Sequence, residues 1–381
     1  MSSAEGDKCR LRIALLVDRF GRKYGGAEAY GVELFRGLSQ RHDVTVIAHE
    51  FDHDLPIREI RIRGSRRWPS WLRVCHFAWR ARALTRSGYD IVHSHMNAGL
   101  GDVHVAHVVP FQYRKLIGKP WLQRLVKWLD PSTAAYLLLE RASFSSKGGR
   151  QLVAVSPLIR QQMLECGVHA AQLSVIPPGV HLKTADPDVR GHFRGQLGWG
   201  DDVIGCLMVA RNPLRKGLQS LVDALALLGS NIRLLVVGAE KDVKQRLAKM
   251  SPEVAQRLIL LGPKTDVSPY YQAADVFVHP TLNDSFGMSP LEAMAHGLPV
   301  VMSDRRFCGF AEYCRDQEHA ILLDDPQDVQ SLADAIERIV SDASLRERLI
   351  ANGSILAASM SWDQVARQFE TLYDRVMRHK A

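Results

Sequence analysis

Two acidic residues with seven residues between them, Asp284 and Glu292, mark the segment whose residue types most clearly suit ligand binding or catalysis. Ser289 suits the N-cap of a helix and Pro290 its first position, so we expect a short helix to begin there, with Glu292 in its first turn. The backbone N–H groups of residues 287–289 would then favour an anion such as a diphosphate, assisted by the helix dipole. Carboxylates beside such a site are useful if they accept hydrogen bonds from hydroxyl groups, one on a sugar and one on a ribose. The alternative is a helix that is merely well capped and packed under a sheet.

A strand must hold this segment in place, and the apolar run at residues 276–279 predicts one. Similar apolar runs alternate with helical patterns along the chain. In the first half they are residues 11–17, 44–48, 91–93, 103–108 and 152–155. In the second half they are residues 203–209, 232–237, 258–261, 298–302 and 320–323. Successive βα units of this kind predict an α/β protein with two doubly wound, Rossmann-like parallel sheets.

The length of 381 residues favours two domains. The paired prolines Pro177 and Pro178 interrupt regular structure and predict the boundary between them. We therefore expect an N-terminal domain at residues 1–178 and a C-terminal domain at residues 179–361. The helical pattern at residues 362–381 is expected to pack back on the first domain.

Several bulk features concern the environment of the protein. No apolar run approaches the ~20 residues of a membrane-spanning helix, and residues 1–8 lack the apolar core of a signal peptide. The six cysteines have no CxxC spacing, which indicates reduced thiols. These features predict a cytoplasmic protein, with association at the cytoplasmic face of the inner membrane as a second interpretation.

Residues 284–292 resemble the E-x7-E element of glycosyltransferase family 4. Members of that family have the GT-B fold, in which two Rossmann-like domains face a central cleft. By resemblance, Asp284 would hold hydroxyl groups of the donor sugar and Glu292 the ribose. The first acid is Asp where the family usually has Glu, and this departure leaves the sugar selectivity open. The resemblance implies donor-binding roles for Gly25, Gly26, Arg211, Lys216, Pro263, Asp284, Gly287, Met288, Ser289 and Glu292.

Arg211 and Lys216 follow a predicted strand and precede a predicted helix. They resemble the family's basic pair that neutralises the donor diphosphate. Two fixed cations would stabilise a departing diphosphate without a metal ion, so we expect neither a metal nor another cofactor. The alternative is two exposed basic residues on a loop. Gly25 and Gly26 resemble a loop that approaches the donor phosphates, where only glycine lets the backbone come so close.

His107 follows the apolar run at residues 103–106, where relatives place a His or an Asp near the reacting sugar. It would bond a sugar hydroxyl or developing charge, or it is a strand-end histidine satisfied by the backbone. Asp18 is a weaker candidate for holding the acceptor, because strand ends often carry a turn-forming Asp. The neighbouring His93, His95 and His104 are not expected to bind zinc, because strand alternation would separate them onto different faces. The predicted catalytic residues are thus Asp284, His107, Arg211 and Lys216, and the family's retaining mechanism is implied.

Charge is shared unevenly along the chain. Residues 1–180 carry 26 Lys/Arg and 15 Asp/Glu, whereas residues 181–381 carry 23 and 26, which predicts an anionic partner for the first half. Residues 61–73 and 111–129 combine basic and aromatic side chains. In the second stretch, apolar residues recur at helical spacing: Trp121, Leu122, Leu125, Trp128 and Leu129. Such a helix would either lie on an anionic membrane or face the core with a solvated basic side.

Together these features predict a retaining glycosyltransferase. It would move a hexose from a nucleoside-diphosphate sugar, with UDP-glucose favoured, to a lipopolysaccharide-core, glycolipid or other glycan acceptor. Within the family the sequence is similar to glucosyltransferases of the lipopolysaccharide core. The alternatives are a sugar-nucleotide epimerase of the same fold and a non-catalytic protein that binds anionic surfaces. Nucleic acid is not expected as a partner, because it leaves Asp284, Glu292, Arg211 and Lys216 without a role.

Overall fold

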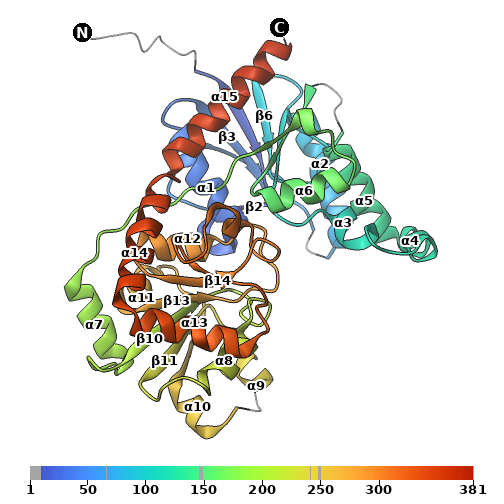
Figure 1. Cartoon of the computed structure of the whole chain (residues 1–381). Helices are drawn as coiled ribbons and strands as arrows, with labels where there is room; N and C mark the ends of the chain where they lie inside the picture. Colours follow the sequence, from blue (N-terminus) through green and yellow to red (C-terminus); the bar gives the residue numbers. More distant parts are fainter. Residues whose placement is uncertain (1–9, 66, 146–148, 241, 248–249, 381) are drawn as a thin grey trace, which may run out of the picture. The chain divides into compact units, whose positions relative to one another are not determined.

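The computed structural model describes residues 10–65, 67–145, 149–240, 242–247 and 250–380 (Figure 1). Two compact units divide the chain: unit 1 contains Met1–Pro178 and Trp362–Ala381, and unit 2 contains Gly179–Ser361. Residues 1–8, considered above for a targeting signal, and Cys9 lie outside the described residues. The other five cysteines are free thiols.

Unit 1 is built on a seven-stranded parallel sheet with the strand order β5-β3-β1-β6-β7-β8-β9. Two short strands of the same unit, β2 and β4, form a separate parallel pair. The strands are β1 Arg12–Leu16, β2 Arg19–Gly21, β3 Asp43–Ala48, β4 Glu50–Asp52, β5 Arg58–Arg61, β6 Ile91–Ser94, β7 Val103–Ala106, β8 Gln151–Ala154 and β9 Leu173–Val175. The helices are α1 Gly26–Leu38, α2 Ser70–Leu84, α3 Phe111–Leu116, α4 Trp121–Trp128, α5 Pro131–Ser143, α6 Pro157–Glu165 and α15 Trp362–Lys380.

Unit 2 contains a six-stranded parallel sheet with the order β12-β11-β10-β13-β14-β15. Its strands are β10 Ile204–Val209, β11 Ile232–Val237, β12 Leu258–Leu261, β13 Val276–His279, β14 Val300–Ser303 and β15 Ile321–Leu323. Its helices are α7 Pro187–Leu197, α8 Leu218–Leu225, α9 Val243–Arg246, α10 Pro252–Arg257, α11 Ser268–Ala273, α12 Met288–Ala295, α13 Val329–Ser341 and α14 Ala343–Ala358. The central strands are mainly apolar because helices cover both faces of the sheet, which confirms the predicted doubly wound architecture.

Helix α15 belongs to unit 1, although it follows unit 2 in the sequence. It packs on α1 and β6, as Figure 1 shows for the red helix. Phe369 and Tyr373 are fully buried in this contact. Glu370 accepts a hydrogen bond from Arg41 (2.6 Å), and Lys380 Nζ lies 2.8 Å from Asp102 Oδ2.

The basic, aromatic stretch at residues 111–129 forms two helices, α3 and α4, separated by Gly118 and Pro120. Helix α4 has no buried residue, so its interpretation as a core-facing helix is wrong. Within the described part of the chain, no helix has the length and apolar character needed to cross a bilayer.

Candidate active site

Most of the residues predicted to act on a ligand in unit 2 follow the carboxyl ends of β10 and β13, which are neighbours in the sheet. The loop after β10 carries Lys216, and the loop after β13 carries Asp284. Lys216 Nζ lies 2.5 Å from Asp284 Oδ2, and His279 Nε2 lies 3.0 Å from the same oxygen. Ligands of open α/β sheets bind outside this edge, where loops of adjacent strands meet.

Glycine residues allow the two loops to come so close together. Gly217 has φ +82°, and a Cβ there would lie 1.9 Å from the carbonyl oxygen of Pro280. Gly287 has φ +103°, and a Cβ there would lie 2.6 Å from Cys308 Sγ. Both positions therefore exclude a side chain by conformation and by contact. Gly217 thus lets the N-terminus of α8 lie against the loop after β13, and Gly287 lets the N-terminus of α12 lie against Cys308.

The ionisation of Asp284 is set by its two partners. Burial alone would raise the pKa of this carboxyl, but the hydrogen bond from His279 and the charge of Lys216 outweigh it and hold the pKa well below its usual value. Burial lowers the pKa of His279, so its ring is neutral at pH 7 and donates its Nε2–H to Asp284. Asp284 is therefore an oriented carboxylate, with its Oδ2 held by Lys216 and His279.

Glu292 lies on α12 and has a different environment. Tyr271 O–H donates to Glu292 Oε2 over 2.8 Å, and the Tyr271 side chain is fully buried. Burial raises the pKa of Glu292, and the Tyr271 hydrogen bond opposes this shift. The tyrosine thus fixes Oε2 of the Glu292 carboxylate.

Helix α12 begins two residues earlier than we predicted from the Ser-Pro pair, at Met288 instead of Pro290. Its N-cap is Gly287 in the left-handed conformation, without a side-chain cap, so Ser289 is not the N-cap. Glu292 consequently lies beyond the first turn, which contains no acidic residue. In the described part of the chain, no side chain caps the first N–H groups of α12, those of Met288 and Ser289. They remain suited to an anion, as expected for a helix N-terminus.

Two further predicted residues lie at the same edge of the sheet. Arg211 is exposed and comes two residues after β10. Pro263 is exposed and comes two residues after β12. The sheet thus gathers the predicted groups of unit 2 at its carboxyl edge, from three different loops.

In unit 1, Gly25 is the N-cap of α1 and Gly26 its first residue. Among the described residues, none outside the adjoining backbone has an atom within 4 Å of the position that a Gly26 Cβ would occupy, and the N-cap, a glycine, makes no side-chain hydrogen bond. Asp18 follows β1 with its side chain 55% exposed, 3.6 Å from Arg19 Nε. These residues lie at the carboxyl edge of the sheet of unit 1.

His107 lies at the carboxyl end of β7 against Tyr30 and His95, with ring centroids 4.7 and 4.5 Å away. Burial lowers the pKa of His107 to about 4, so the ring is neutral at pH 7. Among the described residues its Nε2 has no hydrogen-bond partner, and neither does the Tyr30 hydroxyl. These groups are available to a ligand or to water.

The expected separation of the other histidines is correct only for His104, which contacts Phe144. His93 and His95 lie on the same face, because they are two residues apart, with 3.1 Å between their Nε2 atoms. His93 Nδ1 also bonds the hydroxyl of Tyr373 on α15 (2.6 Å). Within the described ranges, no three His, Cys, Asp or Glu side chains are arranged to hold a metal ion.

Sequence reasoning did not assign roles to Tyr271 or His279, which position the two acids. His279 carried a usable signal, because it ends the strand that leads to Asp284. Tyr271 carried none, because its contact with Glu292 spans 21 residues and depends on the packing of α11 against α12.

Comparisons with known proteins identify the relatives of this chain. The family described as Glycosyltransferase Family 4 matches residues 24–184, and the family described as Glycosyl transferases group 1 matches residues 189–355. A D-inositol 3-phosphate glycosyltransferase of Xylanimonas cellulosilytica is 29% identical over 227 residues, which cover 56% of this chain and 54% of that relative. The chain thus matches about half the length of this relative. Lipopolysaccharide glucosyltransferase WaaG of Escherichia coli K12 is 25% identical over 309 residues, or 78% of this chain and 77% of WaaG.

Solved structures agree with these families at the level of the fold. The crystal structure of WaaG, a glycosyltransferase involved in lipopolysaccharide biosynthesis, has a TM-score of 0.80 at 22% identity and covers 96% of this chain and 99% of that one. HepE of Anabaena, solved with UDP-glucose, has a TM-score of 0.73 at 19% identity and covers 96% and 100%. This likeness confirms the predicted GT-B type of fold.

Proposed function

The chain belongs to glycosyltransferase family 4, and from this premise we propose that it moves a hexose from UDP-glucose or a similar nucleotide sugar to a lipopolysaccharide-core, glycolipid or other glycan acceptor. The paired arrangement of Asp284 with Lys216 and His279, next to the N-terminus of α12, is the observation that carries the proposal. Family membership favours transfer over the epimerase and over the non-catalytic surface-binding protein. HepE, which shares the fold, was solved with UDP-glucose, and this supports the choice of donor.

In the proposed reaction the donor diphosphate lies at the first N–H groups of α12, with Lys216 and Arg211 as the nearby cations. The diphosphate gains charge as the sugar–oxygen bond breaks, so these groups stabilise the transition state more than the ground state. Asp284 Oδ1 accepts a hydrogen bond from a hydroxyl group of the hexose, and Glu292 accepts one from a ribose hydroxyl group. We propose retention of the anomeric configuration and no requirement for a metal ion.

Donor binding tests this proposal directly. The purified chain is titrated calorimetrically, in EDTA, with UDP-glucose, UDP-galactose, UDP-N-acetylglucosamine, GDP-mannose and ADP-heptose. We expect one donor to bind best, and Asp284→Ala or Glu292→Ala to weaken its binding at least ~10-fold, because each loses a bond to a hydroxyl in a desolvated site.

Matched controls are Asp201→Ala and Glu347→Ala, whose exposed carboxyls lie away from this edge of the sheet. They should bind the donor like the unsubstituted chain. If none of the donors binds, or if the Asp284 and Glu292 variants bind as well as their controls, the proposed donor site is wrong.

The acceptor side of the proposal rests on unit 1. We propose that the neutral ring of His107 bonds a hydroxyl group of the reacting sugars, and that Asp18 bonds the acceptor. With a donor identified, transfer to deacylated lipopolysaccharide core and to a glycolipid extract is followed by mass spectrometry. His107→Ala should lose transfer but keep donor binding in unit 2.

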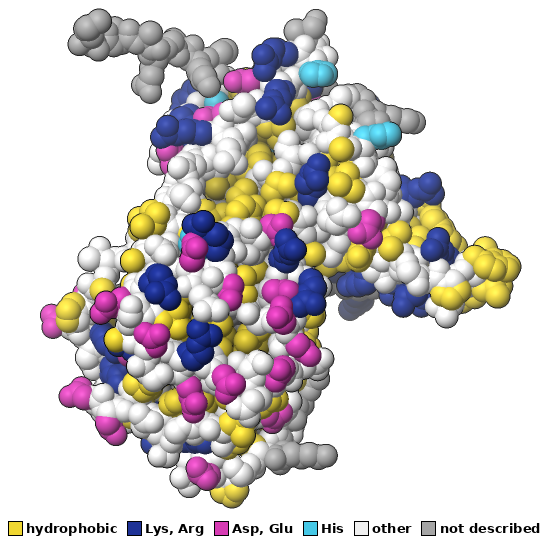
Figure 2. All heavy atoms as spheres, in the orientation of Figure 1, with side chains coloured by type: hydrophobic (Ala, Val, Ile, Leu, Met, Phe, Trp, Pro, Cys, Tyr) yellow, Lys and Arg dark blue, Asp and Glu magenta, His cyan; other side chains and the backbone are white. Residues whose placement is uncertain are grey.

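We also propose that α4 contacts an anionic membrane surface. Trp121, Leu125 and Leu129 are 71%, 56% and 76% exposed, which is unusual for large apolar side chains. Arg124 and Lys127 lie between them, and Figure 2 shows the apolar side chains gathered at the end of the molecule where Figure 1 labels α4. An interfacial helix combines these two features. The stretch at residues 61–73, of which residue 66 is not described, adds the exposed Trp68 (44%).

Vesicle sedimentation tests the membrane proposal. The chain should bind vesicles of phosphatidylglycerol and phosphatidylethanolamine better than vesicles of phosphatidylcholine alone. A Trp121→Ser and Leu125→Ser double variant should lose this binding, whereas Ile355→Ser, which removes another apolar side chain that is 69% exposed, should keep it. Equal sedimentation of all these proteins would refute a role for α4.

A further inference from the structure

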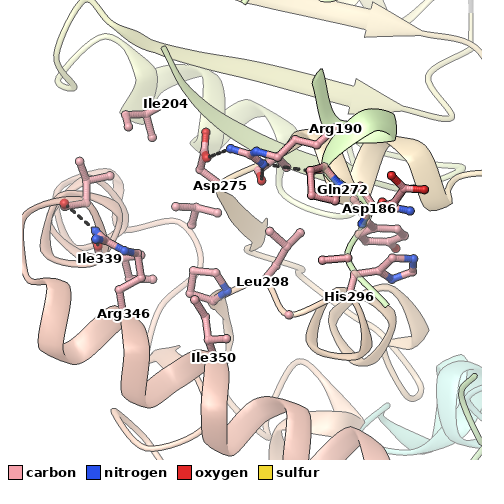
Figure 3. Close-up of a pocket in the computed structure, with 18 residues that line it drawn as sticks. Asp186, Arg190, Ile204, Gln272, Asp275, His296, Leu298, Ile339, Arg346 and Ile350 are labelled. Carbon is pink, nitrogen blue, oxygen red and sulfur yellow. Dashed lines mark hydrogen bonds and ion pairs between the residues drawn. The ribbon is translucent and has the colours of Figure 1, made fainter. Parts of the chain in front are cut away.

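A cavity of about 680 Å³ lies within unit 2, and neither Asp284 nor Lys216 is among the residues that line it. Its walls include Ile204 and Val276, the first residues of β10 and β13, and Pro299, which directly precedes β14. These positions mark the amino ends of the strands, whereas Asp284 and Lys216 follow the carboxyl ends. The cavity is therefore a separate feature of the opposite edge of the sheet (Figure 3).

The side chains that line the cavity are mainly apolar, and few of them are charged. Ile204, Leu298, Ile339 and Ile350 point into the space drawn in Figure 3, between α13, α14 and the strand ends. Pockets of ~300–1,000 Å³ with mainly apolar walls and a few polar groups are typical of sites for small molecules. An apolar body of a ligand would be well accommodated here.

Most charged groups of the lining are already paired. Arg190 Nη2 lies 2.5 Å from Asp275 Oδ1, and Arg190 Nη1 donates to two backbone carbonyls. Asp186 Oδ1 caps α7 by accepting the N–H groups of residues 188 and 189. His296 has a partner on each ring nitrogen. Asp275 also pairs with Arg194, at 3.0 Å. Asp186 keeps its negative charge, but Figure 3 places it beside His296, on the side of the cavity away from Arg346.

Arg346 is different. Its Nη1 donates to the carbonyls of Ile339 and Val340 at the end of α13, at 3.1 and 3.0 Å. Within the described residues no carboxylate pairs with it, and its Nε and Nη2 donors have no acceptor. Figure 3 shows its guanidinium group beside the cavity, across from Arg190 and Asp275. The cavity thus combines mainly apolar walls with one arginine, Arg346, that has no carboxylate partner among the described residues.

We propose that this cavity binds a small amphipathic anion, with the apolar body against Leu298 and Ile350 and the carboxylate or phosphate on Arg346. A guanidinium group binds such an oxyanion through a charge-assisted hydrogen bond that a neutral head group cannot replace.

The cavity also touches the proposed donor site through one side chain, and this part of the inference rests on the proposed function. Tyr271 lines the cavity and donates its O–H to Glu292. A ligand that shifts the Tyr271 ring changes the orientation of a carboxylate assigned to the ribose. Occupancy of the cavity is therefore expected to change the affinity for UDP, and UDP to change the affinity for the cavity ligand by the same factor.

The probes are octanoate and its neutral analogue octanol, titrated calorimetrically into the full chain. Octanoate should bind with a Kd below about 1 mM. Arg346→Leu should weaken octanoate about tenfold and leave octanol unchanged. Ile350→Trp should abolish the binding of both probes, because the indole fills the cavity. Arg348→Leu is the matched control, since Arg348 lies on the same helix and also donates to a carbonyl (3.1 Å) but does not line the cavity.

Octanoate binding that is absent, or that survives both Ile350→Trp and Arg346→Leu, would overturn the cavity site. Coupling is read separately, as the ratio of the UDP Kd values with and without octanoate. A ratio that differs from one in the unsubstituted chain and returns to one in Tyr271→Phe supports the coupling, and a ratio of one in both overturns it. If UDP itself does not bind, the donor site fails while the octanoate titrations still decide the cavity.

Discussion

Replacing Lys216 by Met removes the cation from Asp284 and keeps a side chain of similar length. The two charged atoms are 2.5 Å apart, and the side chains are only 12% and 20% exposed. At an effective dielectric constant of about 20, their attraction is on the order of 7 kcal/mol. Desolvation of both ions offsets much of this, and breaking such a pair costs roughly 3 kcal/mol in measured cases, because the remaining charge stays buried without its counterion. We therefore expect Lys216→Met to lower the free energy of unfolding of unit 2 by about 3 kcal/mol at pH 7.

The loss should depend on pH in a defined direction. In the unsubstituted chain the folded pKa of Asp284 is below its unfolded value, so the pair stabilises the fold above the unfolded pKa, and this stabilisation is lost as pH falls through the folded pKa. Without Lys216 the carboxyl takes up a proton more easily, which relieves the buried charge. The difference between variant and unsubstituted chain should therefore be larger at pH 7 than at about pH 4.5.

Hydrogen exchange of the β10 and β13 amides, measured by mass spectrometry at both pH values, reports the stability of this unit. The Lys216→Met and Asp284→Asn double variant, which leaves no buried charge, should recover part of the loss. Lys183→Met, at an exposed lysine, is the control. A loss below about 1 kcal/mol, or a double variant less stable than the single one, would refute this account of the pair.

Three other outcomes are expected. In chemical denaturation, Gly287→Ala should lower the free energy of unfolding by roughly 2–4 kcal/mol, because alanine is strained at the positive φ and its Cβ collides with the Cys308 sulfur. Adding Cys308→Ala should restore only the part of the loss that is due to the collision. The same loss in the single and the double variant would contradict this reasoning. Tyr271→Phe should raise the Kd for UDP several-fold, measured by calorimetry, since Glu292 loses its only described hydroxyl partner. Burial lowers the pKa of His107 to about 4, so the unfolded chain binds more protons between about pH 4 and 6.5 and the stability of unit 1 should fall as pH drops through that range. His107→Gln should reduce this slope in hydrogen exchange, and an unchanged slope would show that the ring titrates normally.

Much of the fold could be predicted from the sequence because parallel strands that are buried on both faces consist of short runs of apolar residues. The run at residues 232–237 coincides with β11, and the run at residues 276–279 with β13. Helix ends that depend on the backbone conformation of one residue are harder to predict from the sequence. Ser289 and Pro290 carry the residue types of a helix start, yet α12 starts at Met288 because Gly287 takes the left-handed conformation.

The site was predicted only as far as resemblance and local spacing reach. Asp284 and Glu292 share one segment, whereas Lys216 lies in the loop after another strand and meets Asp284 only through the pairing of β10 with β13. The spacing of Trp121 and Leu125 predicted a helix but could not say which way its apolar face points, because that depends on the neighbouring elements. The cavity beside Arg346 is formed by elements distant in the sequence and leaves no local pattern.

The return of α15 to unit 1 has a consequence for how the chain is made. On the ribosome the N-terminal residues emerge first, but Phe369 and Tyr373, which close their core, emerge only after all of Gly179–Ser361. Unit 2 is one continuous segment and can finish folding earlier. Until α15 arrives, the faces of α1 and β6 that it covers lie open, including His93. A nascent chain that stalls before Trp362 would thus carry a folded second half and an incompletely folded first half. The apolar surface that α15 normally covers would then be exposed to chaperones and proteases.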